Sequence, residues 1–170
     1  MSKVSSGILL FYRGGEHLKG SLDGGQLEVL LVHPGGPFFK NKDDGSWTIP
    51  KGELDPDEDL ELAARREFEE ELTIKLSLPA IYLEQITQKG GKVVHAYACE
   101  AEASLRETIL SLDLEKVSSM FELEWPPKSG KKKLFPEIDR ATFYSIPEAR
   151  LKINPAQIPF LERLIHQLKV

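Results

Sequence analysis

Residues 52–74 read GELDPDEDLELAARREFEEELTI, and this stretch carries the negative charge of the chain. Residues 53–71 contain ten acidic residues and two arginines, a local net charge of −8. The whole chain of 170 residues has a formal net charge of only −5, so the remainder is positive. The charge alone leaves two interpretations open: a solvated acidic helix, or a site that holds a divalent cation.

Residues 60–72 predict an amphipathic helix, because they contain no glycine or proline and are rich in good helix formers. One apolar ridge recurs every four residues, at Leu60, Ala64, Phe68 and Leu72. Glu67 and Glu71 lie four residues apart and Glu70 follows Glu67 by three, so these carboxylates share a face beside the ridge. Like charges at this spacing destabilise a bare helix, and a cation such as Mg²⁺, which prefers oxygen ligands, would relieve the repulsion.

The ends of this helix are less regular than its middle. Residues 55–58 resemble a capping box with a proline at the first helical position, while Asp59 is a competing N-cap. At the other end Thr73 stands where a glycine usually adopts the left-handed conformation. A β-branched residue is strained there, so we expect a different exit turn.

The fixed residues of the stretch follow a defined spacing: Gly52, five residues, Glu58, seven residues, Arg66-Glu67, two residues and Glu70-Glu71. This spacing resembles the signature box of the Nudix hydrolases. Every defined position of that box is matched except its last glycine, which is Thr73 here.

The resemblance extends to Ser6-Gly7, to residues 47–52 and to residues 143–149, and so covers most of the chain. It implies an α/β fold: a Nudix-type α/β/α sandwich with a mixed β-sheet between helices, formed by residues 1–170 as a single domain. It also implies Mg²⁺- or Mn²⁺-dependent hydrolysis of a nucleoside diphosphate linked to another moiety. Nucleoside triphosphates and dinucleoside polyphosphates are the favoured substrates.

The same resemblance assigns roles to the residues of the box. Glu67 and Glu71 are the leading metal ligands, together with the backbone carbonyl of Gly52. Glu70 is either a third ligand or the base that takes a proton from water. Arg66 is expected to orient a carboxylate, and Glu58 is interpreted as structural.

Four residues outside the box are further candidates, each with a plainer alternative. Glu137 stands where some family members supply another metal ligand, but it also fits an ordinary surface acid. Lys51 could meet a phosphate oxygen or face solvent. Lys131, in the lysine-rich segment 128–133, could attract a polyphosphate or serve only solvation. Trp47 could stack on a base or belong to the core.

Composition limits the remaining classes of function. No apolar run is long enough to span a membrane, and the chain lacks the features of a signal peptide. Cys99 is the only cysteine, which excludes an intramolecular disulfide and suits a reducing cytoplasm. The mild acidity argues against a nucleic-acid polymer as the main partner. A homodimer stays open.

Two rival functions share the expected fold. One is a catalytically silent Nudix-fold module that binds a nucleotide as a regulator; such modules usually lose glutamates that are present here. The other is an isopentenyl-diphosphate-type isomerase, which would need a catalytic cysteine, and Cys99 lies in a strand-like apolar context instead.

The rest of the chain alternates strand and turn patterns. We expect strands at residues 6–12, 27–33, 81–89, 92–100, 120–125 and 141–146, and helices from residue 147 and over residues 155–169. Residues 104–117 give no clear pattern, and a short strand is the expectation there. The segments 13–25, 34–47 and 128–133 are expected to be loops, and the segment 34–47 is either a substrate wall or a plain connection.

Overall fold

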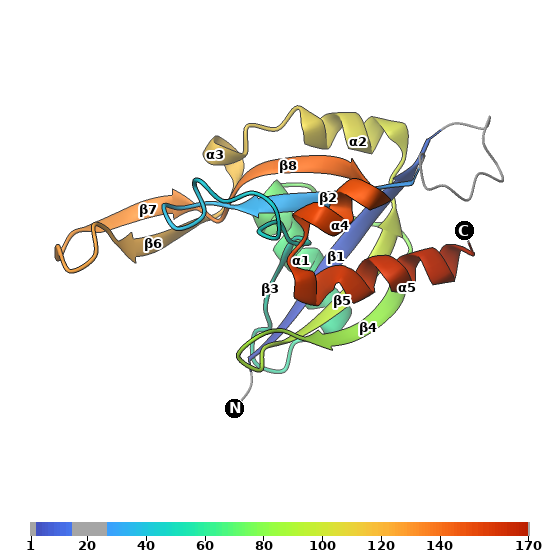
Figure 1. The fold of residues 1–170 in the computed structure, drawn as a ribbon, viewed down its shortest axis with the longest axis horizontal. Coiled ribbons are helices and arrows are strands. Elements are labelled where there is room, and N and C mark those ends of the chain that lie inside the picture. Colours follow the sequence, from blue (N-terminus) through green and yellow to red (C-terminus); the bar gives the residue numbers. More distant parts are fainter. Residues whose placement is uncertain (1–2, 15–26, 170) are drawn as a thin grey trace.

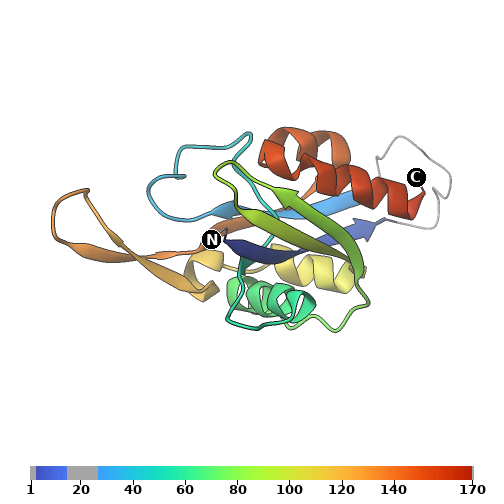
Figure 2. The ribbon, with the colours of Figure 1, turned by 90° about the horizontal axis from the view of Figure 1, so that it is seen from below.

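A computed structural model describes residues 3–14 and 27–169 of the chain. It consists of a mixed β-sheet between two layers of helices, which Figure 2 shows edge-on. The expected α/β/α sandwich is therefore confirmed. No helix within the described residues is long and apolar enough to cross a membrane.

The central sheet has the strand order β4-β5-β1-β2-β8, with β3 paired to β1 outside this path. β1 and β5 are parallel, whereas the other neighbouring pairs are antiparallel. The strands are β1 (Val4–Arg13), β2 (Leu27–Pro34), β3 (Lys51–Glu53), β4 (Ile81–Thr87), β5 (Val93–Glu100) and β8 (Ile138–Ser145). β1 and β2 form the expected antiparallel pair, but most of the loop between them lies outside the described residues.

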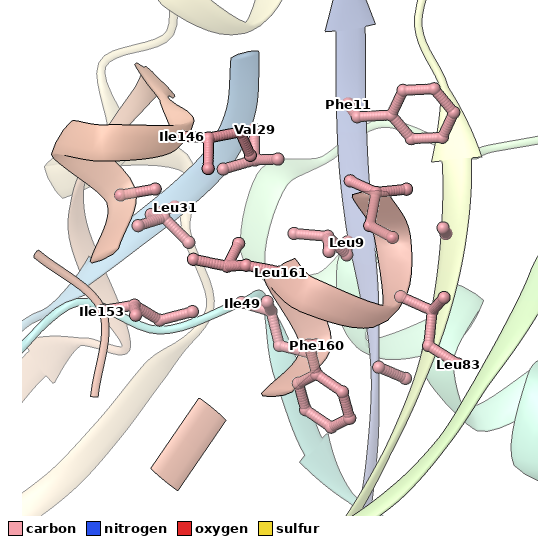
Figure 3. Packing of buried hydrophobic residues seen from close by; sticks show 14 of the residues in the cluster. Leu9, Phe11, Val29, Leu31, Ile49, Leu83, Ile146, Ile153, Phe160 and Leu161 are labelled. Carbon is pink, nitrogen blue, oxygen red and sulfur yellow. The ribbon is translucent and has the colours of Figure 1, made fainter. Parts of the chain in front are cut away.

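Both faces of the sheet are covered by helices, which explains why residues 8–11 of β1 and residues 29–32 of β2 are apolar without interruption. In β1, Leu9 and Phe11 belong to one buried cluster, while Ile8 and Leu10 belong to the other. This alternation follows from the two-residue period of a strand. Figure 3 shows the first cluster, in which Phe160 and Leu161 of the last helix meet residues of the sheet.

The helices divide between these two faces. One face carries α1 (Leu60–Leu72), α2 (Ala103–Leu110) and α3 (Leu114–Val117). The other carries α4 (Ile146–Lys152), the 3₁₀ turn η2 (Pro155–Gln157) and α5 (Ile158–Leu168). The C-terminal helix therefore lies within its predicted span but starts after a 3₁₀ turn.

The expectation of a short strand in residues 104–117 was wrong. Two short helices occupy this segment, and each anchors one apolar side chain on the core, Ile109 from α2 and Leu114 from α3. Residues 103–117 contain no glycine or proline, so the segment can form helix once a hydrophobic surface is available to pack against.

A second, two-stranded sheet projects from the body as a hairpin (Figure 1). It consists of β6 (Met120–Glu124) and β7 (Lys132–Pro136). The lysine-rich segment 128–133 is therefore only partly a loop, because Lys132 and Lys133 are paired with β6.

The two ends of α1 differ in how well they were predicted. Asp59 is the N-cap, and its side chain accepts hydrogen bonds from the backbone N–H groups of Glu61 and Leu62, both at 3.1 Å. The expectation of a different exit turn at Thr73 was wrong: Thr73 has φ +62° and ψ +11°, the left-handed conformation. Its N–H bonds to Glu69 O at 2.7 Å, so helix termination imposes the conformation on a β-branched residue.

Candidate active site

A polar pocket of about 430 Å³ opens between α1, β3 and the start of β8. Its walls come from parts of the chain that are far apart in sequence. The charged residues that line it are Lys51, Glu53, Asp55, Arg66, Glu67, Glu70, Glu71, Lys92 and Glu137. The pocket thus collects the glutamates that the sequence placed on one face of α1.

The position of α1 over the sheet is fixed by its first turn and by β3. Ser6 of β1 donates a hydrogen bond from its hydroxyl to Leu60 O at 2.7 Å. The pairing of β3 with β1 places Gly52 opposite Ser6. A Cβ at Gly52 would overlap the carboxylate of Glu67, so only glycine allows the backbone to come this close to the helix.

Glu67 and Glu71 are buried, with 8% and 4% of their surface exposed. Burial, followed by repulsion from Glu70, raises the pKa of Glu67. Burial and the neighbouring Glu67 raise the pKa of Glu71 well above its usual range. The Oε2 atom of Glu71 is buried without a hydrogen-bond partner. An orphaned carboxylate oxygen of this kind is costly unless a cation or a proton meets it.

Arg66 connects the glutamates to the loop that precedes the helix. Its Nε and Nη2 atoms each donate to one carboxylate oxygen of Glu58 at 2.8 Å. Its Nη1 atom donates to Glu67 Oε1 at 2.9 Å and to Glu70 Oε1 at 3.0 Å. The guanidinium lowers the pKa of Glu58 to about 2, and Glu58 in turn raises the pKa of Arg66. Glu58 therefore braces Arg66, as a structural residue would.

Within the described residues, no three His, Cys, Asp or Glu side chains already stand in an arrangement that could hold a metal ion. The Nη1 atom of Arg66 engages two of the candidate ligands, Glu67 and Glu70. The donor set nevertheless fits a divalent cation: the Glu67 carboxylate lies beside the Gly52 backbone, Glu71 lines the same pocket, and its Oε2 atom has no hydrogen-bond partner.

Two lysines face these carboxylates across the pocket. Burial, together with the neighbouring ammonium of Lys92, lowers the pKa of Lys51 to about 8. Lys51 thus lies in the pocket and not in open solvent. Lys92 was missed by the sequence reasoning: it follows the Gly90-Gly91 turn, and nothing in its local pattern distinguishes it from a surface lysine.

Glu137 also lines the pocket, although its side chain is exposed. Partial burial, followed by repulsion from Glu70, raises its pKa. Its backbone N–H donates to Ser119 O at 2.8 Å and its carbonyl accepts from Gly35 N at 2.9 Å. Glu137 is thus held at the junction between the pocket and the β6–β7 hairpin.

The other two predicted substrate residues lie elsewhere. Trp47 is only 2% exposed, has Arg140 5.1 Å from its ring centroid, and donates from Nε1 to Asp43 at 2.8 Å. The prediction that Trp47 stacks on a base is therefore wrong, because the ring is part of the core. Lys131 lies in the turn of the β6–β7 hairpin and not among the residues that line the pocket.

Comparisons with known proteins agree with this geometry. The sequence model of the NUDIX domain matches residues 21–164. A mutT/nudix family protein from Listeria innocua has a similar structure, with a TM-score of 0.62 at 20% identity over 98% of this chain and 94% of its own. No curated protein sequence matches the chain.

Two further structures have the same fold. A C. elegans Ap4A hydrolase, described as a binary complex, matches with a TM-score of 0.59 at 20% identity, over 97% of this chain and 98% of its own. The NUDIX domain of Shewanella oneidensis NrtR, complexed with ADP ribose, matches with a TM-score of 0.54 at 14% identity, over 99% and 89%. Identities this low establish a shared fold and nothing more.

Proposed function

The chain belongs to the NUDIX family of pyrophosphohydrolases, and from this premise we propose that it hydrolyses a phosphoanhydride bond in a nucleoside triphosphate or a dinucleoside polyphosphate. The proposed cofactor is Mg²⁺ or Mn²⁺. We also propose that residues 1–170 act as one Nudix domain.

One observation carries the proposal. Two buried glutamates, Glu67 and Glu71, face one pocket beside the backbone of Gly52, and a buried oxygen of Glu71 has no partner. Buried carboxylates normally form hydrogen bonds or ion pairs, and a pair of them at one point suits a cation with oxygen ligands. We assign Glu67, Glu71 and the Gly52 carbonyl as the ligands, and Glu137 as a candidate ligand at the rim.

A divalent cation bound there would neutralise phosphate oxygens and lower the pKa of a water molecule. The chain itself supplies the remaining functions. Water attacks a phosphorus atom, a new P–O bond forms, the anhydride P–O bond breaks, and the proton of the water must be accepted. We propose that Lys51 and Lys92, which line the pocket, interact with the negative charge of the phosphate groups.

We propose Glu70 as the group that accepts this proton. It lines the same pocket as Glu67 and Glu71, but 47% of its side chain is exposed, so water reaches it. Arg66 holds Glu70 Oε1 at 3.0 Å and thereby orients the carboxylate. General bases of this kind contribute about 10²–10⁴-fold to rates.

The test is an assay of phosphate or nucleotide release from a panel that includes Ap4A, ATP and other nucleoside triphosphates, with Mg²⁺, Mn²⁺ or EDTA. Ap4A, a dinucleoside polyphosphate, is included because an Ap4A hydrolase shares the fold. We expect metal-dependent turnover by the wild type and a loss of about 10²–10⁴-fold in kcat for Glu70→Gln. Glu69→Gln is the matched control, because Glu69 is exposed on the same helix and does not line the pocket. Absence of turnover on the whole panel would refute the proposal.

A further inference from the structure

The β6–β7 hairpin, residues 120–136, projects from the body of the fold, and none of its residues line the pocket. It is a separate two-stranded sheet that projects on the same side of the body as the loop 34–47 (Figures 1 and 2). A two-stranded hairpin is only marginally stable in water without further packing. Its side chains therefore indicate what it packs against or binds.

The strand register sorts these side chains onto two faces. Opposed residues of antiparallel strands point to the same face, and successive residues alternate. Phe121 is opposite Phe135, and Leu123 is opposite Lys133. Trp125 N donates to Lys131 O at 2.8 Å, which continues this register. We call this the inner face; it carries Phe121, Leu123, Trp125, Lys131, Lys133 and Phe135.

The inner face is turned toward the loop 34–47. A Cβ at Gly36 would lie 2.8 Å from Phe121 Cζ, so the loop backbone contacts the hairpin directly. Further along, the rings of Phe38 and Trp125 meet edge to face with their centroids 5.6 Å apart. Phe38 is still 56% exposed, so its ring remains available to a ligand. Buried His33 helps to hold the loop in place, because its Nε2 atom lies 2.7 Å from the backbone oxygen of Lys42.

The inner face begins at the active-site pocket. Pro34, where the loop starts, and Glu137, where the hairpin ends, both line the pocket. At the other foot of the hairpin, Ser119 N donates to Glu70 O at 3.1 Å. The hairpin and the loop are thus two walls that lead outward from the glutamates.

The charge of this region is positive. Lys128, Lys131 and Lys133 form no salt bridge with any described residue, whereas Lys132, on the opposite face, lies 3.4 Å from Glu122. Lysines interleaved with partly exposed aromatic rings, beside the exposed ring of Phe38, are a combination that binds phosphates and stacks on bases. It contrasts with the acidic pocket, which suits a cation.

We propose that the inner face and Phe38 bind the distal part of a dinucleoside polyphosphate, the phosphates and nucleoside beyond the bond that is cleaved. This rests on the proposed function and names the substrate class for the same site. β6 alone spans about 17 Å at the usual rise of a strand. A ligand must therefore extend well beyond the pocket to reach Trp125. Lys131 and Lys133 contact the distal phosphates, and the distal base stacks against Phe38.

The test compares Ap4A with ATP as substrates of the double variant Lys131→Ser/Lys133→Ser and of Phe38→Ala. We expect each to lower kcat/KM for Ap4A about tenfold, through KM, and to change kcat/KM for ATP less than about twofold. Lys132→Ser, on the opposite face, is the matched control and leaves both values unchanged. Circular dichroism checks that Phe38→Ala is folded.

Three results overturn the assignment: no loss on Ap4A, equal losses on both substrates, or a preference for a 5′-triphosphorylated oligonucleotide that the same lysine variant abolishes. The last would make a nucleic-acid strand the ligand. If the wild type cleaves neither substrate, the proposed function fails, and the inner face is judged by binding. Ap4A should then quench the tryptophan emission of the wild type but not that of Trp125→Phe, in which Trp47 is the remaining tryptophan. Absence of quenching in the wild type overturns the inner-face assignment.

Discussion

Replacement of Glu71 by glutamine separates two effects of the buried carboxylate: the stability that it costs the folded chain, and its proposed role as a metal ligand. Burial and the neighbouring Glu67 raise the pKa of Glu71 well above the ordinary value of 4.5. A carboxyl group with a raised pKa in the folded state lowers stability once the pH passes the pKa of the unfolded chain. Each unit of such a shift corresponds to about 1.4 kcal/mol.

We therefore expect metal-free Glu71→Gln to be more stable than the wild type at pH 8. The gain is about 1.4 kcal/mol, or about 3–5 °C in Tm for a chain of this size, for each unit by which the pKa is raised. The difference should vanish well below pH 4.5, where Glu71 is protonated in both the folded and the unfolded state, and grow as the pH rises. Thermal unfolding in EDTA at several pH values measures this.

Addition of Mg²⁺ should reverse the order of stability. Binding to the folded wild type contributes about 2.7 kcal/mol when the metal concentration is 100 times Kd, and the variant lacks the ligand that makes this possible. Glu69→Gln, an exposed position on the same helix, serves as the control and should behave like the wild type throughout. A variant that is less stable than the wild type in EDTA at pH 8 would refute this account of Glu71.

Substitutions at three other positions test separate parts of the structure. Glu58→Gln weakens the paired hydrogen bonds to Arg66 and should cost about 1–3 kcal/mol in urea unfolding at pH 7; because the pKa of Glu58 is lowered to about 2, this difference should shrink as the pH falls toward 2. Thr73→Gly should stabilise the chain by about 1 kcal/mol, because glycine adopts φ +62° without strain, and a lower Tm would contradict this. Trp47→Ala should cost about 3–5 kcal/mol of stability, since the ring is buried, while Trp47→Phe should leave KM for nucleotides unchanged.

The parts of the fold that could be predicted depend on local patterns. The helix α1 occupies residues 60–72, as predicted. Its apolar ridge joins the buried cluster through Ala64, Phe68 and Leu72. The strand β1 could be recognised because both of its faces are buried and residues 8–11 are apolar without a break. In both cases the local periodicity and the tertiary packing require the same residues.

The residues whose positions could not be predicted are placed by packing between distant parts of the chain. Lys92 reaches the pocket because β3 and the start of β5 both pair with the first residues of β1, an arrangement that no local pattern encodes. Trp47 was open to two interpretations, and only its contacts with His33 and Tyr144 decide for the core. Thr73 shows the reverse case, in which a local rule against left-handed β-branched residues yields to the need to end a helix.

Arg66 engages Glu67, one of the proposed metal ligands, and Glu70, the proposed base. Its Nε and Nη2 atoms are held by Glu58, so only Nη1 is shared with Glu67 and Glu70. A cation that recruits Glu67 needs to displace only this last contact, and the guanidinium stays in place because two hydrogen bonds to Glu58 remain. We therefore expect Arg66 to keep orienting Glu70 after the metal binds. On this reasoning Glu58 matters for catalysis through the position of Arg66, without contacting metal or substrate.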